Sequence, residues 1–99
     1  MRYAKRRDAN HGSIRSALEA IGAGVYDAAG DGSPYDFLVF WRGNVYICEV
    51  KDGAKSASRR KLTVKEVQLH ELARKHGVGV RIIETEDQAL ALVGARRMA

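Results

Sequence analysis

The chain has 99 residues, the length of one ordinary domain, and 45% of them are apolar, which excludes a wholly disordered polypeptide. Its formal net charge of +5 favours a polyanionic partner, of which nucleic acid is the commonest. No apolar run approaches the roughly 20 residues of a membrane-spanning helix, and no hydrophobic segment follows the basic start. We therefore expect neither a membrane anchor nor a signal peptide.

The first regular element is predicted to be a helix over residues 10–21. Ile14 and Leu18 follow helical spacing, Asn10 is placed to cap the start of the helix, and Gly22 is placed to end it. The preceding segment, 1–9, is rich in basic residues and predicts a flexible arm. The domain proper is therefore expected to span residues 10–99.

Two strands joined by a tight turn are predicted in the middle of the chain. A short strand at 25–26 and a turn-rich loop at 28–34 come before them. Residues 35–41 and 45–51 are rich in aromatic and β-branched residues, as strands are. Arg42-Gly43-Asn44 between them indicates a hairpin.

The second half of the chain carries two capping-box patterns, each of which predicts the start of a helix. They are Thr63 with Glu66 and Thr85 with Gln88. We expect the first helix to end near residue 76, a strand at 78–83, and a last helix ending at Gly94. The order helix, strand, hairpin, helix, strand, helix predicts one mixed α/β domain with a central sheet.

The hairpin brings three charged residues together. A two-residue loop at 42–43 places Asp36 opposite Glu49, and a loop at 43–44 places it opposite Lys51. Side chains alternate along a strand, so in either register the three share one face unless a bulge intervenes. A cross-strand ion pair at a solvated edge would explain them, and so would a metal site, because Mg²⁺ prefers carboxylate oxygens.

The same residues carry a family resemblance. Ser33-Pro34-Tyr35-Asp36, a hydrophobic strand and then Glu49-Val50-Lys51 resemble the PD-(D/E)xK nuclease signature, although Tyr35 separates the proline from the aspartate. Within that superfamily the chain resembles the VRR-NUC family, particularly its short stand-alone phage and bacterial members. The match extends from the basic start to Lys61-Leu62-Thr63, which opens a helix carrying Gln68. The (D/E)xK triplet alone is a weak motif, and this combination is more specific.

The resemblance implies a restriction-endonuclease-like α/β fold, a central mixed β-sheet flanked by helices. It also implies a Mg²⁺- or Mn²⁺-dependent endodeoxyribonuclease that cuts branched DNA, with four-way (Holliday) junctions the leading candidate. One chain has one active centre, so symmetrical cutting of a junction would require a homodimer. The single cysteine, Cys48, fits a buried small hydrophobe in a reducing cytoplasm, that of a bacterial or phage-infected cell.

The resemblance also implies a role for individual residues. Asp36 and Glu49 become metal ligands with the Val50 carbonyl as a third, Lys51 becomes the catalytic lysine, and Gln68 faces the site. Basic residues near the site are expected to contact phosphate groups, which positions DNA without reading its sequence. They are Arg6, Arg7, Lys55, Arg59, Arg60 and Lys61.

One position departs from the family pattern and leaves the function open. Related nucleases often carry a glutamate in the first helix where this chain has His11, with Glu19 and Asp8 as weaker candidates for the missing acid. His11 could ligate a metal, bind a metal-bound water, or be a surface residue. If the acid is truly lost, the chain is a degenerate nuclease fold that only binds DNA. A further alternative is a basic RNA-binding or assembly protein, in which Glu49 and Lys51 form an exposed ion-pair edge.

Overall fold

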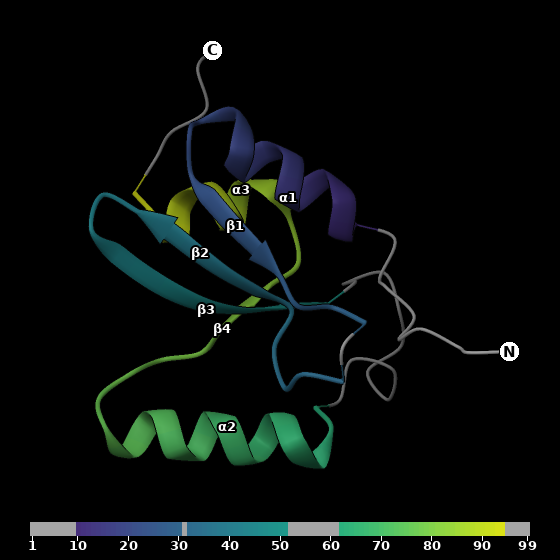
Figure 1. The fold of residues 1–99 in the computed structure, drawn as a ribbon, viewed down its shortest axis with the longest axis vertical. Helices are drawn as coiled ribbons and strands as arrows, with labels where there is room; N and C mark the ends of the chain where they lie inside the picture. The colour runs from purple at the N-terminus through teal and green to yellow at the C-terminus, as the bar shows by residue number, and fades with distance from the viewer. Residues whose placement is uncertain (1–9, 31, 52–61, 95–99) are drawn as a thin grey trace, which may run out of the picture.

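The computed structural model describes residues 10–30, 32–51 and 62–94, and the predicted basic arm and the 52–61 loop lie outside them. In chain order the elements are α1 (His11–Ala20), β1 (Gly24–Asp27), β2 (Phe37–Trp41), β3 (Asn44–Val50), α2 (Val64–Lys75), β4 (Arg81–Ile83) and α3 (Glu86–Leu92). The strands form one sheet in the order β1-β2-β3-β4, with β3 and β4 parallel and the other pairs antiparallel. Helices α1 and α3 lie together on one side of the sheet and α2 lies on the other (Figure 1). The predicted α/β class with a mixed central sheet is confirmed.

The β2–β3 hairpin turns at Arg42 and Gly43. Both have positive φ angles, 47° and 81°, which is the requirement of a type I′ turn and matches the twist of the strands. The positive φ angle of Arg42 is unfavourable for a residue other than glycine. Its guanidinium lies 4.8 Å from the centre of the Trp41 ring, and this cation–π contact offsets part of that cost. Trp41 pairs with Asn44 and Phe37 with Cys48, so the first of the two predicted registers is the observed one.

One face of the sheet forms the hydrophobic core against α1 and α3. Its members share the inward side of their strand or helix: Ile14, Leu18, Ala23, Phe37, Val39, Cys48, Val50, Ile83, Ala89 and Val93. Cys48 is buried here as predicted, and burial raises the pKa of its thiol to about 12. The thiol therefore stays protonated at neutral pH and behaves as a small hydrophobe.

The other face of the sheet, toward α2, is covered incompletely. Phe40, Val45 and Ile82 on this face are exposed. Within α2 only Glu66 and Ala73 are buried, so this helix does not bring a continuous apolar stripe to the sheet. Alternation along β3 puts Cys48 and Val50 in the core and turns Glu49 to the α2 side.

The predicted strand at 78–83 is too long, because only Arg81–Ile83 forms β4. These residues pair with the last three of β3. The backbone N–H of Val78 instead donates to the carbonyl of Ala73 at 2.8 Å, so the chain is still leaving α2 at that point. Within the described residues, no helix is both long enough and apolar enough to span a membrane.

Candidate active site

Asp36 lies one residue before β2 and makes two hydrogen bonds to the end of β3, one through its backbone and one through its side chain. Its backbone N–H donates to the carbonyl of Cys48 at 2.9 Å, although Cys48 is already paired with Phe37. Two residues facing one partner is the pattern of a β-bulge. The Asp36 carboxylate stays buried, and its Oδ2 accepts the Val50 N–H at 2.7 Å. The bulge therefore shifts Asp36 out of the ladder and still holds its side chain against the end of β3.

Glu49 is the most unusual residue of the protein, because its carboxyl group is fully buried. Neither oxygen accepts a hydrogen bond from a donor in the described part of the chain. Burial first, then the hydrogen bond with the Glu66 carboxyl group and the charge of Asp36, together raise the pKa of Glu49 to about 9, although the Lys51 ammonium lowers it. In the metal-free protein Glu49 is therefore protonated at neutral pH.

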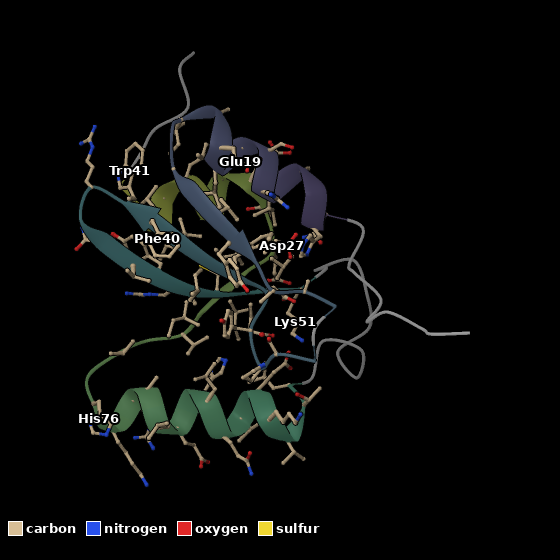
Figure 2. All side chains as sticks on the ribbon, in the orientation of Figure 1. Glu19, Asp27, Phe40, Trp41, Lys51 and His76 are labelled. Atoms are coloured by element: carbon tan, nitrogen blue, oxygen red, sulfur yellow. The ribbon has the colours of Figure 1, made fainter. Side chains whose placement is uncertain are left out.

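Lys51 follows β3 directly and is held at both ends. Its backbone N–H donates to the carbonyl of Ile83 at 3.0 Å. Its side chain is 13% exposed, with Nζ 3.6 Å from Glu49 Oε2 and 3.4 Å from Glu66 Oε1. Figure 2 shows Lys51 between the sheet and α2. The structure thus brings Asp36, Glu49 and Lys51 together at the end of β3, but Asp36 is held there by the bulge, which the hairpin-parity argument had left out.

Asn10 occupies the N-cap position of α1, as predicted, but its side chain makes no capping hydrogen bond. Its Nδ2 donates instead to the carbonyl of Lys51 at 3.0 Å and to that of Glu84 at 2.6 Å. Lys51 follows β3 and Glu84 follows β4. Asn10 therefore ties the start of α1 to the ends of two neighbouring strands and restrains the backbone that carries Lys51.

Glu66 is a member of this cluster that the sequence assigned only to helix capping. The predicted capping box is confirmed, because Glu66 Oε1 accepts the Thr63 N–H at 2.8 Å and Thr63 Oγ1 accepts the Glu66 N–H at 3.2 Å. Glu66 is also 1% exposed and reaches Lys51 with the same oxygen. The capping pattern marked the residue, but only the docking of α2 shows that it points at the end of β3.

Gln68 does not join the cluster, which corrects the expectation that it faces the site. It is exposed, whereas Glu66, two positions earlier, is buried. Two residues are about 200° apart around an α-helix, so the two side chains leave α2 on nearly opposite faces. The carboxylate of Glu66 occupies the place that the resemblance gave to Gln68.

His11 is buried, so the alternative that made it a surface residue is wrong. Its Nε2 lies 3.0 Å from Asp27 Oδ2, and its ring centre lies 4.5 Å from that of Phe37. Asp27 also accepts from Arg15 at 3.2 Å. Phe37 points into the core, so His11 lies on the α1 side of the sheet, opposite Glu49. Figure 2 shows Asp27 beside α1, away from the α2 side on which Lys51 lies.

The remaining candidates are placed as follows. Glu19 is exposed and pairs with Arg15 at 3.4 Å on the surface of α1, so it does not replace the missing acid at the cluster. The N–H of Val50 points toward Asp36, and its carbonyl leaves the strand on the same side. Asp8 and the six basic residues expected to bind phosphate groups lie outside the described ranges. Among the described residues, no three His, Cys, Asp or Glu side chains converge in the geometry of a metal site.

Glu49 makes the stability of the metal-free protein depend on pH. Its pKa is 4.5 in the unfolded chain and about 9 in the folded protein, so the folded state keeps a proton that the unfolded chain releases. The free energy of unfolding must therefore fall as the pH rises through this range. We expect urea unfolding in EDTA to show lower stability at about pH 8.5 than at about pH 6, and a much smaller difference in Glu49→Gln. Equal pH dependence in the two proteins would contradict this assignment.

Comparison with known proteins gives one informative likeness. No protein-family model matches the chain, and no curated protein is significantly similar to it. A solved structure described as a VRR_NUC domain matches with a TM-score of 0.60 and 26% identity, covering 87% of this chain and 96% of that one. The fold agrees over nearly the whole domain. The chain therefore has the fold of a VRR_NUC nuclease domain, which supports the resemblance found in its sequence.

Proposed function

We propose that the protein is a metal-dependent DNA endonuclease whose active centre consists of Asp36, Glu49 and Lys51. The carboxyl group of Glu49 carries this proposal. It is fully buried beside the carboxyl groups of Asp36 and Glu66 and 3.6 Å from the Lys51 ammonium, and neither of its oxygens accepts a hydrogen bond from a described donor. Burying a carboxyl group unsatisfied is costly, and such exceptions to the burial rule concentrate where an ion or a substrate supplies the missing interaction. The likeness to a VRR_NUC domain supports a nuclease in particular.

The donor set suits Mg²⁺ or Mn²⁺. Asp36 and Glu49 offer carboxylate oxygens and Val50 a backbone carbonyl, the hard ligands that these ions prefer. A divalent ion held there would polarise the scissile phosphodiester and lower the pKa of a bound water. Because Glu49 carries a proton at neutral pH, loading the site displaces that proton, so the affinity for metal should increase with pH.

The chain's own side chains supply the rest of the chemistry. The Lys51 ammonium, partly open to solvent, can contact a non-bridging phosphate oxygen and offset the charge that develops during hydrolysis. Its position between the carboxyl groups of Glu49 and Glu66 keeps it directed at the site. Arg59, Arg60 and Lys61 are expected to bind the flanking phosphates.

Branched DNA, with four-way junctions first, is the proposed substrate, and a homodimer is the proposed active form. The support is the family pattern quoted from the sequence and the presence of one Asp36–Glu49–Lys51 cluster in each chain. Two centres are needed to cut two strands of a junction symmetrically. The apolar side chains left exposed on the α2 side of the sheet are compatible with a second subunit.

The test compares end-labelled four-way junction, linear duplex and single strand of the same sequence in Mg²⁺, Mn²⁺, Ca²⁺ or EDTA. We expect cleavage in Mg²⁺ or Mn²⁺ only, with the junction cut fastest, and a dimer by analytical ultracentrifugation. Binding without cleavage in any metal would favour the degenerate DNA-binding alternative. Preference for RNA, again without cleavage, would favour the basic RNA-binding or assembly alternative.

A further inference from the structure

Glu66 places a buried carboxyl group where the family resemblance expected the amide of Gln68, and that carboxyl group contacts Lys51. We propose that Glu66 is a positioning residue that holds the ammonium group of Lys51 in its working orientation. The proposal rests on the proposed function in one respect, since it takes Lys51 to be the residue that contacts the scissile phosphate.

The first support is geometric. Lys51 Nζ donates to Glu66 Oε1 at 3.4 Å and lies 3.6 Å from Glu49 Oε2, so two carboxyl groups from different elements flank one ammonium. A lysine ammonium has three N–H donors and sits on a flexible stem with about 2 kcal/mol of rotamer entropy. Two flanking carboxyl groups restrict that freedom and leave donor capacity for a substrate oxygen.

The second support is the burial of a charged residue where capping does not need it. A capping-box glutamate only has to reach the N-cap N–H, and glutamine does this equally well. Glu66 is nevertheless 1% exposed, whereas the apolar Val64, Val67 and Leu72 of the same helix are exposed. A helix that turns a carboxyl group inward and leaves its aliphatic residues outside is not optimised for stability, and such local conflicts concentrate at functional sites.

The third support is how Glu66 itself is fixed. Its Oε1 accepts the Thr63 N–H at 2.8 Å, so the first turn of α2 orients the carboxyl group before it meets Lys51. Asn10 restrains the Lys51 backbone through its carbonyl at 3.0 Å. Lys51 is thereby located from both ends, its main chain by α1 and its ammonium by α2.

The experiment compares Glu66→Gln with Thr63→Ala. Gln keeps the shape and the capping hydrogen bond and removes the carboxylate, so the variant should fold as well as the wild type. Thr63→Ala weakens the cap by about 1 kcal/mol and leaves the Glu66 carboxylate in place. On the junction substrate we expect Glu66→Gln to lower kcat about 10- to 100-fold with KM nearly unchanged, as misplacement of a reacting group does. Thr63→Ala should lower the melting temperature and leave kcat within about threefold of the wild type, because the Thr63 N–H that orients Glu66 belongs to the backbone and is retained.

A second measurement is independent of cleavage. In ¹⁵N-labelled, metal-free protein, a restrained Lys51 ammonium should give a slowly exchanging ¹H–¹⁵N signal, assigned by its loss in Lys51→Met. We expect Glu66→Gln to abolish this signal and Thr63→Ala to retain it. The proposal is overturned if the signal is absent from the wild type, if it survives in Glu66→Gln, or if both variants lower kcat equally. Should the wild type cut no nucleic acid, the proposed function fails, while the signal still decides whether Glu66 holds Lys51.

Discussion

Glu49→Gln is expected to abolish metal-dependent cleavage while leaving the domain folded. Glutamine has the shape of glutamic acid but cannot become a carboxylate ligand, and the metal contribution to the transition state is several kcal/mol, which corresponds to about a thousandfold or more in rate. Single-turnover cleavage of the junction at saturating enzyme measures this loss directly. Isothermal titration with Mn²⁺ should show the matching loss of metal affinity.

The same substitution should stabilise the metal-free protein at alkaline pH. Glu49 is fully buried, and its ionisation there is opposed by burial and by the neighbouring carboxyl groups. Removing the ionisable group removes that opposition, so the variant should be more stable than the wild type and less active. A variant that loses stability and activity together would show instead that Glu49 serves packing alone.

Lys51→Met is the second substitution with a large expected effect. Methionine keeps most of the aliphatic stem and removes the ammonium, so binding of DNA should be retained while the cleavage rate falls about 100- to 1,000-fold, the usual cost of losing one group that stabilises transition-state charge. Fluorescence anisotropy with labelled junction in Ca²⁺ measures binding, and single-turnover kinetics in Mg²⁺ measures cleavage.

Lys51→Arg is the matched control. It keeps the positive charge between Glu49 and Glu66 but presents a planar, bulkier donor group, so it should retain stability and recover only part of the rate. Equal binding and equal activity in all three proteins would mean that Lys51 makes only a buried structural ion pair with Glu49 and Glu66 and has no part in cleavage.

Local sequence signals predicted much of this fold because they depend on neighbouring residues alone. The capping box at Thr63 and Glu66, the helix stop at Gly22 and the hairpin at Arg42-Gly43 are all formed. Each depends on backbone geometry within a few residues. The length of β4 was mistaken because the chain is still leaving α2 before Arg81, where the Val78 N–H donates to the Ala73 carbonyl instead of pairing with β3.

The candidate site divides in the same way. The period of two along a strand predicted that Asp36, Glu49 and Lys51 share a face if no bulge intervenes, and the family resemblance indicated the chemistry. The sequence could not show that Asp36 leaves the ladder at a bulge, because the bulge depends on hydrogen bonds to Cys48 and Val50 across the hairpin. Nor could it show that His11 pairs with Asp27, sixteen positions away on another element.

The sequence by itself determined the elements, the hairpin and the charged face, since each follows from the conformational preferences of residues close together in the chain. Only the tertiary structure decided which further groups meet that face. The position of α2 brings Glu66, and not Gln68, into contact with the Lys51 ammonium. The position of α1 allows the Asn10 side chain to donate a hydrogen bond to the Lys51 carbonyl. Burial between these elements then raised the pKa of Glu49, because a carboxyl group removed from water loses the solvation that keeps it ionised.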